Sequence, residues 1–350
     1  MKINKMTFSV LTKAGQTEIR ERELPPIGKN QVLVKNLACN ICTTDYGQWL
    51  GLREHQGYPM AGGHESSGEI VALGEGVTDF EVGDKVALAY DGCGECTACR
   101  KNDFLHCANE DSNKKTEDGY LGTFGFANYS VRNTRALIKM NKILDPSEAA
   151  FLEPLATVCK GLKKLRIKPF ETVVVIGGGT MGLLNAVAAK AYACRVIVTE
   201  MMEKKIKTAQ SMGLEVIDAG KYDPAKKVVE MTDGEGADVV IIAAGVTQAN
   251  NQAFEIVKKT DGRILFFAAG YPSPDMTMDS NTIHYRRMEL IGTFAADNED
   301  FFTAGDLLNS GRVQVTKLLE EKRFKLADSQ KAFELASKPG MFRVSIRLQE

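Results

Sequence analysis

Hydrophobic and polar positions follow two different rhythms along the chain. Up to about residue 150, short apolar runs at 32–35, 68–73 and 84–88 alternate with polar residues and glycine. Turn-forming segments at 74–77 and 81–84 separate them. Short strands bounded by turn residues are typical of β-structure. We therefore predict a small, irregular, β-rich domain in this first portion.

From about residue 155, apolar runs alternate with longer helix-compatible stretches. The apolar runs occur at 173–176, 195–199, 215–217, 238–243, 263–268 and 288–294. The helix-compatible stretches between them include 183–192, 203–211 and 248–258. Strands that alternate with helices imply right-handed crossovers and a doubly wound parallel sheet. Two further helix-like segments, 301–309 and 329–337, are predicted to pack back on the first domain.

Length and composition narrow the class of protein. At 350 residues, the chain exceeds the size at which one hydrophobic core usually stops growing, so we expect two domains. A formal net charge of -1 gives no electrostatic case for binding nucleic acid or an anionic membrane. No apolar run approaches the roughly 20 residues of a membrane span. The amino terminus lacks the apolar stretch of a signal peptide, so we expect a cytoplasmic protein. In that compartment, eight cysteines indicate metal ligands more readily than disulfides.

A glycine-rich turn follows the first apolar run of the second portion. Gly177, Gly179 and Gly182 form the pattern G-x-G-x-x-G, and Thr180 and Met181 lie between the last two. The first glycine permits a tight turn, the second lets the backbone approach a pyrophosphate, and the third lets helix and strand pack closely. The pyrophosphate then lies on amide groups at the amino terminus of a helix. The context predicts a dinucleotide-binding turn.

An acidic residue at the end of the next apolar run supports this interpretation. Glu200 lies 23 residues after Gly177 (200 − 177), close to the expected spacing of about 20. Its carboxylate would accept hydrogen bonds from the adenosine ribose and repel a 2′-phosphate. Met201 and Met202 follow it, so no arginine is placed to bind that phosphate. We expect NAD rather than NADP; the alternative is a structural turn with a solvated Glu200.

Four closely spaced cysteines predict a structural zinc site, and they are Cys93, Cys96, Cys99 and Cys107. Four thiolates complete a tetrahedral zinc shell. A redox-active cysteine pair and an iron–sulfur cluster are alternatives. Neither combines naturally with a β-rich domain that precedes a dinucleotide fold. His106 is a possible substitute ligand, but we interpret it as a surface histidine.

A second set of potential metal ligands has the composition of a catalytic site. It comprises Cys42, His64, Glu65 and Glu153. A thiolate, an imidazole and a carboxylate with an open fourth position make a catalytic zinc centre. Each residue alone is ordinary, because cysteines are often buried hydrophobes and lone histidines are usually structural. The prediction of a catalytic zinc site depends on all of these residue types occurring together.

These motifs together resemble the zinc-containing medium-chain dehydrogenase/reductase family. The similarity rests on C-T-T-D at 42–45, G-H-E at 63–65, the four-cysteine loop, G-F-A-N-Y at 125–129, E-P-L at 153–155 and the glycine turn. It covers nearly the whole chain and is greatest to the sorbitol and threonine dehydrogenase branch. The resemblance implies an α/β protein with a GroES-like catalytic domain over 1–155, completed by 295–350. It also implies a Rossmann NAD-binding domain over 156–294.

The resemblance also assigns expected roles at the first zinc site. Cys42 and His64 are implied ligands, whereas Glu65 and Glu153 are implied to bind directly or through water, and the sequence leaves that choice open. Thr44 matches the hydroxyl that takes the substrate proton. By the same resemblance, Asp45 orients the imidazole of His64. At the cofactor site, Lys205 is implied to lie near the adenosine ribose.

One position departs from the family pattern. Many relatives have a histidine five residues after the zinc cysteine, and this chain has Gly47. We expect the proton to leave through Thr44, the cofactor ribose and water, or through another acid such as Glu153. His55 is a possible replacement, but we interpret it as a surface histidine.

The leading hypothesis is an NAD-dependent zinc enzyme that oxidises secondary alcohols, namely polyols, sugar alcohols or sugar derivatives. Two zinc ions per chain are expected, one catalytic and one structural. A threonine-type amino-alcohol dehydrogenase is one alternative. A non-catalytic zinc- and nucleotide-binding protein or redox sensor is an alternative of another class. The expected partners are a small-molecule substrate and further copies of the chain in a homodimer or homotetramer, without nucleic acid or membrane.

Overall fold

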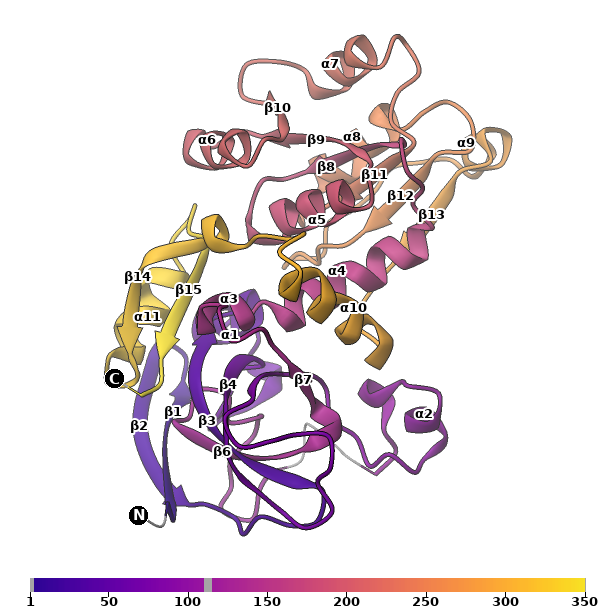
Figure 1. The fold of residues 1–350 in the computed structure, drawn as a ribbon. Helices are drawn as coiled ribbons and strands as arrows, with labels where there is room; N and C mark the ends of the chain where they lie inside the picture. The colour runs from indigo at the N-terminus through magenta and orange to yellow at the C-terminus, as the bar shows by residue number, and fades with distance from the viewer. Residues whose placement is uncertain (1–2, 110–114, 350) are drawn as a thin grey trace. The chain divides into compact units, whose positions relative to one another are not determined.

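The computed structural model describes residues 3–109 and 115–349 (Figure 1). The chain divides into two compact units by its internal contacts. Unit 1 comprises the chain up to Ala156 together with the chain from Ala296 onward, and unit 2 comprises Thr157–Ala295. Within the described residues, no helix combines the length and the apolar character that crossing a bilayer would need.

Unit 1 is built on a mostly antiparallel sheet. Along this sheet the strands follow the order β14 (Leu319–Lys325), β15 (Arg343–Arg347), β3 (Gln31–Asn40), β4 (Glu65–Leu73), β5 (Lys85–Leu88) and β7 (Leu137–Lys139), and β6 (Tyr129–Asn133) also pairs with β3. A separate hairpin consists of β1 (Lys5–Lys13) and β2 (Gln16–Glu23). Apolar residues at alternate positions of β3, β4 and β5, such as Val32, Val34 and Ile70, pack into a common core.

Most helices of unit 1 are short. They are α1 (Thr43–Trp49), α2 (Thr97–Arg100), α3 (Pro146–Ala149), α10 (Asn298–Asn309) and α11 (Ser329–Ala336). Five 3-10 turns are described, at Glu54–Gln56, Phe104–His106, Thr134–Ala136, Thr316–Leu318 and Leu326–Asp328. Helix α4 (Leu152–Leu165) begins in unit 1 and continues into unit 2.

Unit 2 is a doubly wound parallel sheet. The strands follow the order β10 (Glu215–Asp218), β9 (Arg195–Glu200), β8 (Thr172–Ile176), β11 (Val239–Ile242), β12 (Arg263–Phe266) and β13 (Glu289–Gly292). The connecting helices are α5 (Thr180–Ala191), α6 (Glu203–Ser211), α7 (Pro224–Met231), α8 (Thr247–Ile256) and α9 (Ser280–Arg286). Every residue of β11 is buried, which requires cover on both faces of the sheet. The order reverses between β8 and β11, where such sheets bind ligands.

The predicted fold class is therefore confirmed, with local differences. The sequence pattern did not predict α7 and α9, although both carry start signals. Asp223 accepts hydrogen bonds from the first amides of α7 and Pro224 occupies its first turn; Asp279 caps α9 in the same way. Each of these helices spans only about two turns, so its apolar residues are too few to show a helical period in the sequence.

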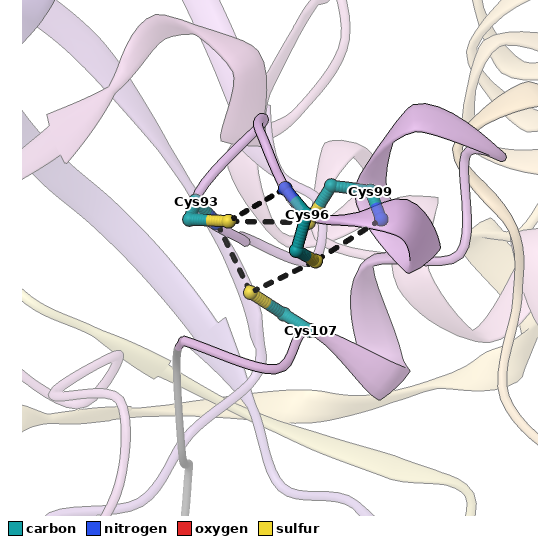
Figure 2. A group of neighbouring side chains, drawn as sticks. All are labelled: Cys93, Cys96, Cys99 and Cys107. Carbon is teal, nitrogen blue, oxygen red and sulfur yellow. Dashed lines mark hydrogen bonds between the residues drawn. The ribbon is translucent and has the colours of Figure 1, made fainter.

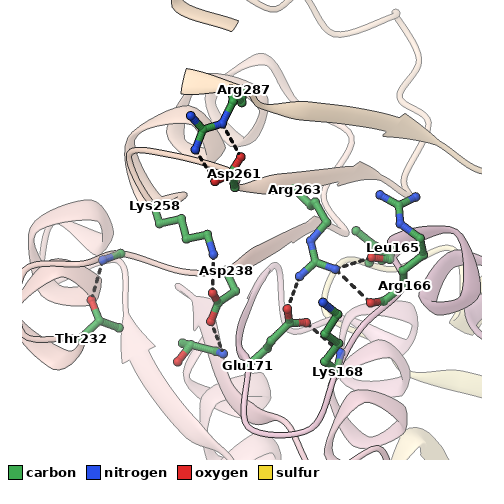
Figure 3. Close-up of polar contacts among 12 residues, drawn as sticks. Leu165, Arg166, Lys168, Glu171, Thr232, Asp238, Lys258, Asp261, Arg263 and Arg287 are labelled. Carbon is green, nitrogen blue, oxygen red and sulfur yellow. Dashed lines mark hydrogen bonds and ion pairs between the residues drawn. The ribbon is translucent and has the colours of Figure 1, made fainter. Parts of the chain in front are cut away.

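A polar network closes one end of the parallel sheet (Figure 3). Arg263 on β12 donates from Nη1 to the carbonyls of Leu165 (2.5 Å) and Arg166 (3.1 Å) at the end of α4. Its Nη2 donates to Glu171 Oε1 at 2.5 Å. The guanidinium thus satisfies helix carbonyls that have no partner within α4. This network ties α4 to the amino end of the sheet.

We expect Arg263→Met to lower the free energy of unfolding of unit 2 by about 3–5 kcal/mol, because it leaves Glu171 and two carbonyls without their buried donor. The matched control is Arg287→Met. Arg287 pairs with Asp261, but the two side chains are 65% and 59% exposed, against 9% for Arg263 and 17% for Glu171. The control should cost about 1 kcal/mol or less. Urea unfolding followed by circular dichroism measures both, and equal losses would contradict this account.

Candidate zinc and nucleotide sites

The first candidate metal site lies where two paired strands of unit 1 meet their loops. Strands β3 and β4 are antiparallel, with Asn40 at the end of β3 opposite Glu65 at the start of β4. Cys42 follows β3 and His64 precedes β4, so both lie at the same end of the pair. The ligand atoms of Cys42, His64 and Glu65 lie within 4.8 Å of one another. The donor set fits zinc.

The loop before His64 requires glycine. Gly63 has a φ of +91°, and a Cβ there would lie 2.8 Å from the amide nitrogen of Phe126 and 2.9 Å from Cys39 Sγ. A side chain at this position would displace the backbone of the 125–129 segment. The G-H-E segment thus lies directly against the G-F-A-N-Y segment.

Asp45 holds the two ligand segments against each other. One carboxylate oxygen accepts the amide of Cys42 at 2.9 Å, and the other accepts the amide of Gly63 at 3.4 Å. The second oxygen also faces Nδ1 of His64 at 3.9 Å. Burial disfavours the charged form of His64, but the neighbouring side chains Asp45, Cys42 and Glu153 together raise its pKa. This placement is the one expected of a group that orients a histidine ligand.

Glu65 is paired with an arginine that the sequence analysis missed. Arg343 on β15 donates from Nε to Glu65 Oε2 at 2.8 Å and from Nη2 to Oε1 at 2.5 Å. The same Nη2 lies 3.6 Å from Cys42 Sγ. The side chains are 4% and 0% exposed. Burial raises the pKa of Glu65, although the charges of Arg343 and His64 oppose the shift.

The structure does not bring Glu153 into the group formed by Cys42, His64 and Glu65. Glu153 lies buried in the first turn of α4, and its Oε1 accepts a hydrogen bond of 2.5 Å from the hydroxyl of Tyr90. Burial and then the neighbouring carboxylate raise the pKa of Tyr90 well above its usual value. Tyr90 was also missed, because nothing in its local sequence marks it as a partner of Glu153.

The remaining predicted residues of this site lie on or near α1. The Oγ1 of Thr44 is 3.9 Å from Cys42 Sγ, and Thr44 is partly exposed. A Cβ on Gly47 would lie 3.4 Å from Cδ of Arg53, so Arg53 occupies the space beside Gly47. His55 is exposed in the 3-10 turn after α1.

The second candidate metal site is the four-cysteine loop (Figure 2). The four Sγ atoms, from Cys93, Cys96, Cys99 and Cys107, lie within 4.8 Å of one another. The Cys93–Cys99 and Cys96–Cys107 sulfur pairs are 3.9 and 4.0 Å apart. A tetrahedral site with Zn–S bonds of about 2.3 Å separates its sulfurs by about 3.8 Å. His106 is exposed and bound to Asp103 instead.

Backbone amides donate hydrogen bonds to the sulfurs of this loop and so favour their thiolate forms. The amides of Glu95 and Cys96 donate to Cys93 Sγ, and that of Cys99 donates to Cys96 Sγ. Hydrogen bonds from the Cys99 and Ala108 amides lower the pKa of Cys96 to about 6, whereas burial raises the pKa of Cys99 to about 12. The loop fits a cation, because only a bound cation allows all four sulfurs to be anionic together.

The glycine turn of unit 2 has the geometry predicted for a dinucleotide site. Gly177 follows β8 with a φ of +103°. A Cβ on Gly182 would lie 1.8 Å from the carbonyl oxygen of Gly177, so helix α5 and the turn pack too closely for a side chain. Gly179 precedes α5 and supplies no side-chain cap, which leaves the first amides of the helix to a ligand such as a pyrophosphate.

The acid at the end of β9 points at this turn. Glu200 Oε2 accepts the amide of Gly178 at 2.7 Å, and Oε1 accepts the amides of Met201 and Met202 at 2.7 and 2.9 Å. Lys205 Nζ lies 3.9 Å from the position that a Cβ on Gly179 would take. Both predicted side chains thus lie beside the glycine turn, and the carboxylate is fixed by three backbone donors.

Two domain families match successive parts of the chain. Residues 28–142 match the alcohol dehydrogenase GroES-like domain, and residues 180–310 match the zinc-binding dehydrogenase domain. The matches cover the four-cysteine loop and the first ligand group in unit 1, and the helix that begins after Gly179 in unit 2.

Individual proteins match over nearly the full length. Sorbitol dehydrogenase of Halalkalibacterium halodurans is 32% identical over 91% of this chain and 92% of its own length. L-threonine 3-dehydrogenase of Pyrococcus horikoshii is 32% identical over 95% of each chain. Among solved structures, a zinc-binding dehydrogenase from Sinorhizobium meliloti bound to NADP superposes with a TM-score of 0.84, at 25% identity, over 98% of this chain and 99% of that one.

We expect two zinc ions per chain by elemental analysis, with one lost in Cys42→Ala and the other lost in Cys96→Ser. Each substitution removes a ligand from one group and leaves the other group intact. Cys194→Ala is the control and should retain both ions, because Cys194 is buried in unit 2 and belongs to neither group. Loss of both ions in either single variant, or of neither, would contradict the assignment.

Proposed function

The chain belongs to the zinc-containing medium-chain dehydrogenase family, and from that premise we propose that it transfers a hydride between a secondary alcohol and NAD. The proposed substrates are polyols, sugar alcohols or sugar derivatives. Family membership makes it an oxidoreductase that acts on CH–OH groups with zinc and a nicotinamide cofactor. The substrate class, the preference for NAD and the count of two zinc ions are parts of the proposal.

The observation that supports this most is the grouping of Cys42, His64 and Glu65 at one end of the β3–β4 pair. A thiol, an imidazole and a carboxylate are the donors of catalytic zinc sites, which keep one coordination position open. We propose that Cys42 and His64 hold the ion and that Glu65 or Glu153 completes the set. When bound there, zinc supplies Lewis acidity that lowers the pKa of an alcohol.

The residues around this centre have separate tasks. Asp45 Oδ2 accepts the amide of Cys42 and holds that segment, and Oδ1, which lies 3.9 Å from Nδ1 of His64, is proposed to orient the imidazole. Thr44, whose hydroxyl lies 3.9 Å from Cys42 Sγ, is proposed to take the proton of the substrate hydroxyl. Because Gly47 offers no histidine, the onward carrier of the proton would be Glu153, or water together with the cofactor ribose when the cofactor is bound.

The cofactor residues lie in unit 2. The amides at the start of α5 are proposed to bind the pyrophosphate, with Thr180 and Met181 in the first turn after Gly179. Glu200 is proposed to accept the adenosine ribose hydroxyls, and Lys205 to lie beside them. The fixed negative charge of Glu200 opposes a 2′-phosphate, so NAD is the preferred cofactor.

Two further parts complete the proposal. The four-cysteine loop holds a structural zinc ion that closes the segment between β5 and β6, since a fully ligated ion has no position for substrate. The protein functions as a homodimer or homotetramer, as the resemblance implies. A second candidate substrate is L-threonine, which is favoured by the 32% identity to a threonine dehydrogenase over 95% of the chain.

We expect the zinc-loaded protein to form NADH with xylitol or sorbitol, and Thr44→Val to lower kcat by about 10²–10⁴-fold because the hydroxyl that takes the proton is lost. Thr44→Ser keeps that hydroxyl and should retain most of the rate. The absorbance of NADH measures the rate of wild type and of the two variants.

The same assay is repeated with L-threonine and with a range of other alcohols. Turnover with threonine and not with polyols would replace the substrate assignment with the amino-alcohol alternative. Zinc-loaded protein that produced no reduced cofactor from any alcohol would contradict the enzymatic function and favour a binding or sensing role.

We expect Glu200→Ala to weaken NADH binding by about 10- to 100-fold, the equivalent of about 1.5–3 kcal/mol for hydrogen bonds to a charged group. NADPH binding should improve relative to NADH, since the repelling charge is gone. Glu203→Ala is the control, because Glu203 is an exposed acid on α6 that pairs with Lys207. Calorimetric titrations with both cofactors measure the change. Unaltered discrimination in Glu200→Ala would contradict the role of this carboxylate.

A further inference from the structure

An arginine fills the space that Gly47 leaves open on α1. A Cβ on Gly47 would lie 3.4 Å from Cδ, 3.5 Å from Nε and 3.9 Å from Cγ of Arg53. The stem of Arg53 and the first nitrogen of its guanidinium therefore pack against this position. Gly47 is buried, whereas Arg53 is partly exposed. The arginine thus covers the glycine and keeps one side open to solvent.

The segment that carries Arg53 is tied back to α1. It follows directly from the helix and returns to it, over residues 50–58. Gln48 Nε2 donates to the carbonyl of Gly57 at 2.6 Å, and the hydroxyl of Tyr58 donates to the carbonyl of Gln48 at 2.9 Å. Gln48 is 3% exposed, so these contacts are shielded from water. The two hydrogen bonds fix the side of the helix on which Arg53 lies.

Gly47 lies on the same face of α1 as Thr44. Residues three apart on a helix have Cβ atoms about 5–6 Å apart, and helical side chains lean toward the amino end. A side chain at position 47 would therefore lean toward Thr44, whose hydroxyl lies 3.9 Å from Cys42 Sγ. Because Arg53 packs in that space, its positive charge lies on the face of α1 that carries the proposed proton acceptor.

A guanidinium in this place can select by charge. Arginine stays protonated at physiological pH and presents its N–H groups in a planar fork that fits a carboxylate or a phosphate. An anionic group adds its own charge to these hydrogen bonds, whereas a neutral hydroxyl does not. Arg343, the other arginine near this metal site, already donates to both oxygens of Glu65. Arg53 lies instead on a partly exposed side that an incoming molecule can reach.

We propose that Arg53 is a specificity-determining residue, which binds a carboxylate or a phosphate group of the alcohol substrate. The substrate is then a hydroxy acid or a phosphorylated polyol, among the sugar derivatives of the proposed function on which this inference rests. The reacting hydroxyl of that substrate lies beside Thr44, and its anionic group lies a few carbons away at Arg53, one helical turn along α1. Neutral polyols of the same length bind more weakly.

Calorimetry tests the binding of the anionic group without turnover. The zinc-loaded protein is titrated with gluconate, with sorbitol 6-phosphate and with sorbitol, which share a six-carbon chain and differ in charge. Arg53→Gln removes the charge and keeps part of the stem, and Arg53→Lys keeps the charge without the fork. The matched control is Lys29→Gln. Lys29 is an exposed cation whose side chain also packs beside a glycine, Gly76, but it precedes β3, whereas Cys42 follows it.

We expect wild type to bind at least one of the two anions about 10- to 100-fold more tightly than sorbitol, the range for hydrogen bonds to charged groups. Arg53→Gln should reduce this ratio to about 1, Arg53→Lys should retain part of it, and Lys29→Gln should leave it unchanged. The anion that binds more tightly identifies the group as a carboxylate or a phosphate. Thermal unfolding verifies that each variant is folded. A wild-type ratio near 1, or a ratio that survives in Arg53→Gln, would overturn the inference.

Turnover gives a separate readout. For the anionic alcohol, Arg53→Gln should lower kcat/KM by the same factor, through KM rather than kcat, because Arg53 does not act on the reacting atoms. Gly47→His should also lower the preference for the anion, since its side chain takes the space of the Arg53 stem. A fall in kcat for all alcohols with no change in KM would contradict a role in specificity. Absence of turnover with every alcohol would refute the proposed function instead, and the calorimetric ratios would still decide the role of Arg53.

Discussion

The register between β3 and β4 is the constraint on which the candidate metal centre depends. With Asn40 opposite Glu65, the segments that carry Cys42 and His64 leave the sheet at the same end. A shift of one residue would turn Glu65 to the opposite face and separate the donors. On the other side of β3, Ser345 of β15 also lies opposite Asn40, and the same register brings Arg343 to this end. Three segments remote in sequence therefore converge through strand pairing alone.

The buried pair of Glu65 and Arg343 links the end of the chain to the β3–β4 pair of unit 1. The carboxylate of Glu65 is fully buried and has Arg343, 278 residues later, as its bidentate partner. Removing one member of such a pair typically costs about 3–5 kcal/mol, because the other charge is left without compensation. The segment from Ala296 onward thus contributes more than apolar cover. It supplies the cation that makes an acidic residue tolerable beside Cys42, and metal chemistry and folding are coupled at this point.

Sequence patterns predicted the parts of the molecule whose determinants are local. The glycine turn, the acid at the end of β9, the four-cysteine loop and the alternation of strands and helices in unit 2 all depend on residues close in sequence. Arg343 and Tyr90 escaped prediction because their importance arises from register and packing between distant strands and helices. The position of Glu153 shows the same limit: its motif indicated a ligand, whereas its observed contact is with Tyr90, a side chain distant in sequence whose ring packs on Phe301.

The most direct test of this account is a crystal structure with anomalous scattering recorded at the zinc absorption edge. We expect two anomalous peaks per chain. One should lie among Cys93, Cys96, Cys99 and Cys107, and the other at about 2.3 Å from Cys42 Sγ with His64 in its coordination shell. Catalytically active crystals with no peak beside Cys42 and His64 would contradict the central claim that this end of the β3–β4 pair is built to hold a reactive metal.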